Sequence, residues 1–185
     1  MNGDTDYNRI ISKYYPADSD VCGILLRHSR SVADLALEIA HRNRLPLDDS
    51  AIETAAMLHD IGIIFTDAPG IGCHGSEPYL RHGVIGAELL RGEGVSETYA
   101  RVAERHTGAG LTAANVARLG LPLPAGRDYM PETLLERLVC YADCFYSKSG
   151  DMQQKSLDRI RAGMARFGED VLARFEALHR QFSKK

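Results

Sequence analysis

Several histidines and one aspartate occupy positions where the helical period favours apolar residues. His28 follows Leu25 by three residues and precedes Val32 by four, so the three side chains point to the same face of a helix. The same spacing puts a polar side chain on the apolar face of five successive helical segments, at His28, His59, His82, His106 and Asp143. A buried imidazole or carboxylate is costly without polar partners. Hydrogen bonds could satisfy one such residue, but five of them, from helices that pack together, predict cations that they share.

The adjacent residues His59 and Asp60 sharpen this hypothesis. Neighbouring helical residues point about 100 degrees apart and do not normally serve one site. This helix is expected to end near Gly62, and at a frayed helix end both side chains can converge. Imidazole nitrogens together with carboxylate oxygens suit iron, manganese or zinc. No cysteine occupies these positions, which argues against a structural zinc site built from thiolates.

The elements that must position these residues are helical. Apolar residues recur at steps of three and four and strand-like alternation is nearly absent, so the sequence predicts an all-α fold. We expect helices over residues 21–42, 48–62, 79–91, 96–106, 112–119 and 130–147, then an amphipathic tail with a bend at Gly168. Pro131 suits the first turn of the helix over 130–147. The Gly/Pro-rich connection over 63–78 leaves from His59-Asp60 and returns just before His82, so we expect a structureless lid over the site.

The length of the chain predicts one main domain with small additions. Of its 185 residues, 44% are hydrophobic and 25% charged, which is typical of globular proteins and argues against disorder. We expect an N-terminal segment over residues 1–20, a main domain over 21–150, and a C-terminal amphipathic helical tail over 151–185 that packs on the domain.

Charge and hydropathy exclude several classes of partner. The formal net charge of -3 argues against a nucleic-acid polymer, whose binding favours a basic excess. No stretch approaches the roughly 18 consecutive apolar residues of a membrane span. The amino end is acidic, whereas a signal peptide begins basic and continues apolar. We therefore predict a cytoplasmic protein without membrane contact, whose four cysteines are reduced.

The string His59-Asp60-Ile61-Gly62, with one histidine upstream, two downstream and a late aspartate, resembles the HD-domain metal-dependent phosphohydrolases, the HDIG subgroup in particular. The resemblance covers about residues 20–150. It implies a helical bundle with a metal site in its core. It also implies one metal ion held by His28, His59, Asp60 and Asp143, and a second held by His82 and His106, with Asp60 as the bridge. The catalytic roles would fall to Asp60, His82 and His106.

The chain departs from this family pattern at two positions. Relatives commonly have a basic residue after the HDIG string, where this chain has Ile63. They also commonly have a lysine directly after the final aspartate, where this chain has Cys144. Other basic side chains would therefore have to contact a substrate phosphate, and we expect them to be Arg81, Arg105 and Lys148.

The function that the resemblance implies is hydrolysis of a small phosphorylated metabolite, with a nucleotide as the expected substrate. Two divalent ions carry more charge than two aspartates balance, so they attract a phosphate and acidify a water molecule. We expect iron or manganese, with magnesium, cobalt, zinc and nickel as alternatives, and we leave a homodimer open.

Two rival functions use the same residues. The ligand set also occurs in mixed-valent di-iron oxygenases of the HD superfamily, which need iron and dioxygen. The other rival is a module that senses a nucleotide without turning it over. All six ligand positions are filled here, which counts against a site that has lost its catalytic activity.

Overall fold

The structure, a computed structural model, describes residues 5–183. It is an all-α protein, as the sequence predicts. Its α-helices are α1 (Tyr7–Tyr14), α2 (Asp20–Asn43), α3 (Asp49–Leu58), α4 (His82–Gly92), α5 (Glu97–Arg105), α6 (Ala113–Leu119), α7 (Leu134–Asp143), α8 (Leu157–Ala165) and α9 (Glu169–Phe182). Among the described residues, no helix combines the length and the apolar character that crossing a membrane requires.

The connection between α3 and α4 has regular structure of its own. It contains three short 3-10 helices, η1 (Ile63–Phe65), η2 (Pro69–Ile71) and η3 (Tyr79–Arg81). Between them lies an antiparallel pair of two-residue strands, β1 (Asp67–Ala68) and β2 (Cys73–His74), with Asp67 opposite His74 and Ala68 opposite Cys73. The expectation of a structureless connection was therefore wrong. Gly72, whose φ is 74°, allows the reversal between the strands because that backbone region favours glycine.

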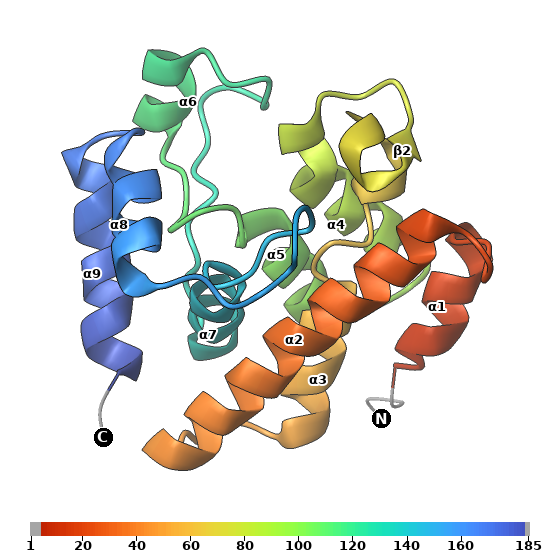
Figure 1. The fold of residues 1–185 in the computed structure, drawn as a ribbon, viewed down its shortest axis with the longest axis horizontal. Coiled ribbons are helices and arrows are strands. Elements are labelled where there is room, and N and C mark those ends of the chain that lie inside the picture. The colour runs from red at the N-terminus through yellow and green to blue at the C-terminus, as the bar shows by residue number, and fades with distance from the viewer. Residues whose placement is uncertain (1–4, 184–185) are drawn as a thin grey trace.

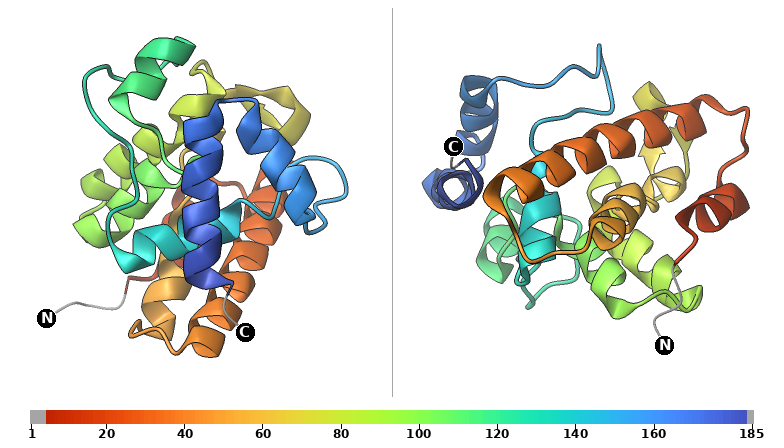
Figure 2. Two further views of the ribbon diagram at one scale, coloured as in Figure 1. Left: turned by 90° about the vertical axis from the view of Figure 1, so that its left-hand side faces the viewer. Right: turned by 90° about the horizontal axis from the view of Figure 1, so that it is seen from below.

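A central group of five helices forms the framework of the molecule. The long helix α2 packs against α3 and α7, α4 packs along α5, and α5 also contacts α3 and α7. The added elements flank this group: α1 lies at one end and the α8–α9 pair at the other (Figures 1 and 2). Of three clusters of buried apolar side chains in the described residues, the two larger are centred on α2, α3 and α7 and on α1 to α5. The framework therefore holds α2, α3, α4, α5 and α7 against one another in the core.

Both ends of the described chain are anchored in this core. The sequence analysis assigned no helix to residues 1–20, of which 1–4 lie outside the described residues. There α1 is capped by Asp6, whose carboxylate accepts from the backbone N–H of Arg9, and the helix buries Ile10 and Ile11. In the tail, Gly168 separates α8 from α9 with a φ of 130°, which provides the expected bend. Helix α9 packs on α7, with Phe175 in the core.

Helix α7 is shorter than the sequence predicts. We expected it over residues 130–147 with Pro131 in its first turn, but it begins at Leu134. The hydroxyl of Thr133 accepts the N–H of Glu136 and so caps the helix, because serine and threonine satisfy the free N–H groups of a first turn. Before this cap, Tyr129 pairs with Leu111 through two backbone hydrogen bonds of 2.7 and 3.1 Å.

Glycines allow α4 to approach its neighbours closely. A Cβ atom on Gly62 would lie 2.2 Å from the carbonyl oxygen of His82. A Cβ atom on Gly83 would lie 2.6 Å from the carbonyl oxygen of Ala103 in α5. Both clashes are with backbone, which cannot rotate away.

We therefore expect Gly83→Ala to destabilise the fold by about 2 kcal/mol, the usual size of an overpacking penalty. Urea unfolding followed by circular dichroism measures the change. Gly92→Ala, at the other end of α4, is the control, because no atom lies within 4 Å of the added methyl group. Equal unfolding midpoints for the two variants would show that the α4–α5 contact tolerates a side chain.

Candidate metal centre

The structure brings the six histidines and aspartates singled out in the sequence into one buried cluster. They come from the five helices of the central group or from the residues next to them. Their potential ligand atoms form two groups, each with all atoms within 4.8 Å of one another. The first group is His28, His59, Asp60 and Asp143, and the second is Asp60, His82 and His106.

The first group gathers around one oxygen of Asp60. Oδ2 of Asp60 lies 3.1 Å from Nε2 of His28 and 3.1 Å from Nε2 of His59. Oδ1 of Asp143 lies 2.9 Å from Nε2 of His28 and 3.5 Å from Nε2 of His59. Two imidazole nitrogens and two carboxylate oxygens thus face one small volume.

The second group gathers around the other oxygen of Asp60. Oδ1 lies 3.3 Å from Nε2 of His82 and 3.3 Å from Nε2 of His106. The two imidazole nitrogens are 3.0 Å apart. The Asp60 carboxylate therefore presents a different oxygen to each group, which is the arrangement a carboxylate needs to bridge two cations.

Most of these residues lie at helix ends. His59 and His106 follow the last residues of α3 and α5, His82 is the first residue of α4, and Asp143 is the last of α7. Helix ends leave backbone groups without helical partners and allow the chain to turn. Only His28 lies well inside a helix.

The turn after α3 explains how two adjacent residues serve one cluster. The N–H of Ile61 donates to the carbonyl of Leu58 over 3.1 Å, and that of Ile63 donates to the carbonyl of Asp60 over 3.0 Å. These bonds span three residues, so the helix tightens as it ends. The side chains of His59 and Asp60 then converge, as the sequence analysis expected of a frayed end.

Backbone carbonyls orient three of the histidines. Nδ1 of His59, His82 and His106 lies 2.6, 2.7 and 2.8 Å, respectively, from the carbonyl oxygen three residues earlier. A carbonyl can only accept, so each Nδ1 carries the proton. Each Nε2 then faces the cluster, and its lone pair is available to a cation once that nitrogen is deprotonated, which is the orientation that metal-binding histidines adopt.

The donor set fits divalent cations. Nε2 of His28, Nε2 of His59 and both carboxylate oxygens of Asp60 are buried and lack a partner in hydrogen-bond geometry within the described residues. Leaving such atoms unpaired is costly, and a cation would satisfy all of them. Burial lowers the pKa of His82 to about 3, so its imidazole is neutral and can donate a lone pair.

Metal affinity should fall as the pH is lowered. Burial disfavours the charged imidazole of His59, but the Asp60 and Asp143 carboxylates outweigh that effect and raise the His59 pKa to about 10. At neutral pH the metal-free imidazole therefore holds a proton that a cation must displace, so affinity should drop about tenfold per unit of pH. Calorimetry in two buffers of different ionisation enthalpy should show about one proton released per chain. Metal binding without proton release would contradict this account.

Lys148 is the one expected substrate contact that the structure brings to the cluster. Its Nζ lies 2.6 Å from Oδ2 of Asp60, and 11% of its side chain is exposed. Burial disfavours its charge, but Asp60 reverses that effect and raises the pKa of Lys148 above its usual value. The chain turns directly after α7, where the N–H of Tyr146 donates to the carbonyl of Asp143. Lys148 thus brings a positively charged side chain to the cluster. Cys144, which stands where relatives commonly have a lysine, does not provide one.

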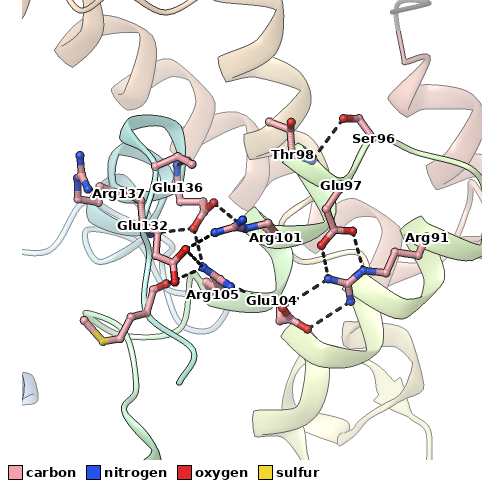
Figure 3. A network of polar contacts seen from close by, with 12 residues as sticks. Arg91, Ser96, Glu97, Thr98, Arg101, Glu104, Arg105, Glu132, Glu136 and Arg137 are labelled. Atoms are coloured by element: carbon pink, nitrogen blue, oxygen red, sulfur yellow. Dashed lines mark hydrogen bonds and ion pairs between the residues drawn. The ribbon is translucent and has the colours of Figure 1, made fainter. Parts of the chain in front are cut away.

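Arg81 and Arg105 are already paired with carboxylates. Nη1 of Arg81 lies 2.6 Å from Oε2 of Glu77. Nη1 of Arg105 lies 2.9 Å from Glu132 and 3.5 Å from Glu136, within a network of arginines and glutamates on α4, α5 and the start of α7 (Figure 3). Both arginines are therefore already neutralised in the structure, and their expected contact with a substrate phosphate stays a prediction. Each precedes a cluster histidine by one residue, and that spacing turns its side chain away from the histidine.

Tyr79 is a residue of this site that the sequence analysis did not single out. Its ring stacks on His82, with 4.8 Å between the ring centroids, and its carbonyl accepts from His82 Nδ1. Burial raises the pKa of its phenol to about 12, so the ring stays neutral. The sequence feature that could have identified Tyr79 is its position three residues before His82, a suspected metal ligand at the start of a helix.

The connection over residues 63–78 borders the site. Gly70 and Ile71 line a cavity of about 450 Å³ together with Asp143 and Lys148. Ile71 and Cys73 are buried in the core, so the connection is anchored. Its location agrees with the expected cover, and its gating role stays a prediction.

Gly70→Phe tests that role. No atom lies within 4 Å of a Cβ atom at Gly70, so a phenyl group should enter the cavity without disturbing the fold. We expect kcat/KM to fall about tenfold, equivalent to about 1.4 kcal/mol, at an unchanged melting temperature. Steady-state kinetics beside the control Gly92→Phe measures the effect. Unchanged kinetics in Gly70→Phe would exclude this side of the cavity as the entrance.

Comparison with known proteins identifies the domain that contains this cluster. The family model described as HD domain matches residues 25–147. Among solved structures, the HD domain of the L. monocytogenes phosphodiesterase PgpH shares the fold, with a TM-score of 0.52 and 16% identity over 96% of this chain and 97% of that chain. The same domain in complex with cyclic-di-AMP gives a TM-score of 0.52 at 15% identity over 98% and 99% of the two chains.

Three curated relatives match a large part of this chain. Two are named tRNA (cytidine(56)-2'-O)-methyltransferase: that of Picrophilus torridus is 31% identical over 92% of this chain and 48% of its own length, and that of Thermoplasma volcanium is 34% identical over 86% and 42%. The uncharacterized protein MJ0778 of Methanocaldococcus jannaschii is 38% identical over 64% of each chain. This chain thus spans about half the length of the two methyltransferases, and more than half of each has no counterpart in it.

Proposed function

This chain belongs to the HD-domain family, and from that premise we propose that it is a metal-dependent phosphohydrolase acting on a small phosphorylated metabolite, a nucleotide in particular. The observation that carries the proposal is the Asp60 carboxylate, which presents one oxygen to each of two groups of buried imidazoles. Such a bridge suits a pair of cations and the transfer of a phosphoryl group.

Four residues would hold one cation and three the other, with Asp60 common to both sets. The first set is His28, His59, Asp60 and Asp143, and the second is Asp60, His82 and His106. Nitrogen and oxygen donors of this kind favour iron or manganese. When bound, the two cations would supply Lewis acidity toward a phosphoryl oxygen and lower the pKa of water.

The chain's own residues would orient the substrate phosphate. Asp143 lines the 450 Å³ cavity and keeps 16% of its side chain exposed, so the cavity leads to the cluster from that side. Lys148 lines the same cavity, and its ammonium group would bind a phosphoryl oxygen and balance its charge. Tyr79 covers one face of His82 and keeps that imidazole in place.

A nucleotide is the proposed substrate class for two reasons. The cavity combines an anion-binding lysine with polar and aromatic side chains, including Ser147 and Tyr79. The HD domain of PgpH, which has the same fold, is described in complex with cyclic-di-AMP. That likeness supports a nucleotide-sized ligand for this chain.

The experiment is a screen for phosphate release by protein purified and assayed without oxygen, loaded with iron, manganese, cobalt or magnesium. The panel contains nucleotides, dinucleotide polyphosphates, cyclic nucleotides and sugar phosphates. We expect hydrolysis with manganese under strict anaerobiosis. No hydrolysis with any metal, together with an oxygen-dependent product in the iron-loaded protein, would replace the proposal by a di-iron oxygenase. Nucleotide binding without any turnover would indicate a sensor.

A further inference from the structure

A second cavity opens directly beside the metal cluster. It has a volume of about 560 Å³, within the range of small-molecule sites. It shares part of its wall with the 450 Å³ cavity that contains Asp143 and Lys148: Gly108, Cys144, Ser147, Lys155 and Met164 line both. The two cavities therefore adjoin, and Asp143 of the metal cluster lines the first of them.

The second cavity, which we call the α6–α8 pocket, is lined on one side by the C-terminal tail. Its walls come from the segment around α6, including Leu111, Leu119 and Leu121, and from α8 with the turn that follows it. The HD-domain match ends at residue 147, so α8 lies beyond it. The pocket is thus formed where the family domain meets this added helix.

The α6–α8 pocket combines an apolar wall with unpaired positive charge. Lys155, Arg159 and Arg166 line it, and none of the three has an ion-pair partner within residues 5–183. Arg81 and Arg105, by contrast, are both neutralised by glutamates. Free cations around a cavity attract an anionic ligand.

The remaining lining residues fit a planar group. Phe167 lines the pocket with 52% of its surface exposed, which leaves a ring face available for stacking. The hydroxyls of Thr107 and Ser147 also line it and have no hydrogen-bond partner in the described chain. A free phosphate would leave the apolar wall unfilled, and a hydrocarbon chain would leave the hydroxyls and cations unused.

We propose that the α6–α8 pocket binds the base of a nucleotide whose phosphate lies at the metal cluster, with Lys155 beside the sugar phosphate that joins the two. The inference rests on the proposed function, which it extends by naming the specificity pocket. Lys155 lines both cavities, so it stands where such a ligand passes from one to the other.

Gly163→Leu tests the pocket by filling it. Gly163 lines the cavity from α8, and no atom lies within 4 Å of a Cβ atom added there. Gly92→Leu is the matched control, because it makes the same change in α4 with equally open surroundings. Phe167→Ala is a second variant, which removes the exposed ring and adds no atoms to the pocket.

The kinetic comparison uses ribonucleoside monophosphates against ribose 5-phosphate, which has the same phosphate but no base. For Gly163→Leu we expect KM for the best nucleotide to rise by at least about tenfold, while kcat/KM for ribose 5-phosphate changes less than about twofold. Phe167→Ala should shift KM in the same direction. If both variants match Gly92→Leu on nucleotides, or if wild-type protein prefers farnesyl phosphate to every nucleotide, the proposal is overturned.

A binding measurement separates this inference from the hydrolase proposal. Fluorescence of methylanthraniloyl nucleotides is titrated with metal-free protein, so no turnover is needed. Binding that Gly163→Leu weakens by about tenfold and Gly92→Leu leaves unchanged supports the pocket even if nothing is hydrolysed. Equal binding by both variants rejects the pocket even if small phosphate esters are cleaved.

Discussion

Asp60→Ala should remove bound metal and hydrolytic activity together. Each of the two groups of imidazoles faces a different oxygen of this carboxylate, so one substitution takes a ligand from both proposed cation sites. It also removes the negative charge nearest to Lys148, whose ammonium group would then repel a cation. We expect metal content to fall from about two ions per chain to near zero and phosphate release to fall at least about a thousandfold.

Metal analysis by mass spectrometry and a phosphate-release assay measure the two losses. Asp60→Asn, which keeps the shape of the side chain, separates loss of charge from misfolding. His41→Ala and His179→Ala are the controls, because His41 pairs with Asp49 on the surface and His179 contacts Tyr141. Retention of both ions in Asp60→Ala, or equal losses in the controls, would mean that the bridge is wrongly assigned.

His82→Ala should remove one cation and leave the other. His82 contributes only to the second group of donors, and the four donors of the first group, which include Asp60, stay intact. We expect metal content to fall from about two ions to about one per chain. We also expect kcat to fall at least about a hundredfold, because one ion cannot stabilise both the attacking and the leaving oxygen of the phosphoryl transfer.

The measurement is metal content at saturating manganese, with kinetics on the same preparation. His74→Ala is the matched control, because this exposed histidine lies in the preceding connection and outside the cluster. A content that stays at two ions, or that drops to none, would contradict the division of the donors into two sites.

The convergence of the six side chains could be predicted because helical spacing makes a misplaced polar residue visible. His28 stands on the same face as Leu25 and Val32, and only a shared partner explains why several helices have such a residue. The resemblance then indicated how the donors divide. The sequence left Arg81 and Arg105 as expected substrate contacts, because it could not show which glutamates pair with them.

What the sequence could not reveal depends on contacts between distant residues. Lys148 reaches Asp60 because the chain reverses after α7, and periodicity does not describe such a turn. The start of α7 was misplaced because Pro131 and Thr133 both suit a helix start, and the pairing of Tyr129 with Leu111 decided between them. The pocket lined by Phe167 exists only once α8 has packed beside α6.

The buried donors without partners also bear on how long this protein survives in a cell. A cation that binds only the folded chain stabilises it by about 2.7 kcal/mol at a hundredfold excess over its dissociation constant. Without the cation, the buried atoms of His28, His59 and Asp60 that lack aligned hydrogen bonds keep part of their desolvation cost, and the chain opens more often. Proteases degrade such transiently opened chains in proportion to their population. The amount of this protein should therefore follow the supply of its metal, so that starvation removes the chain as well as its activity.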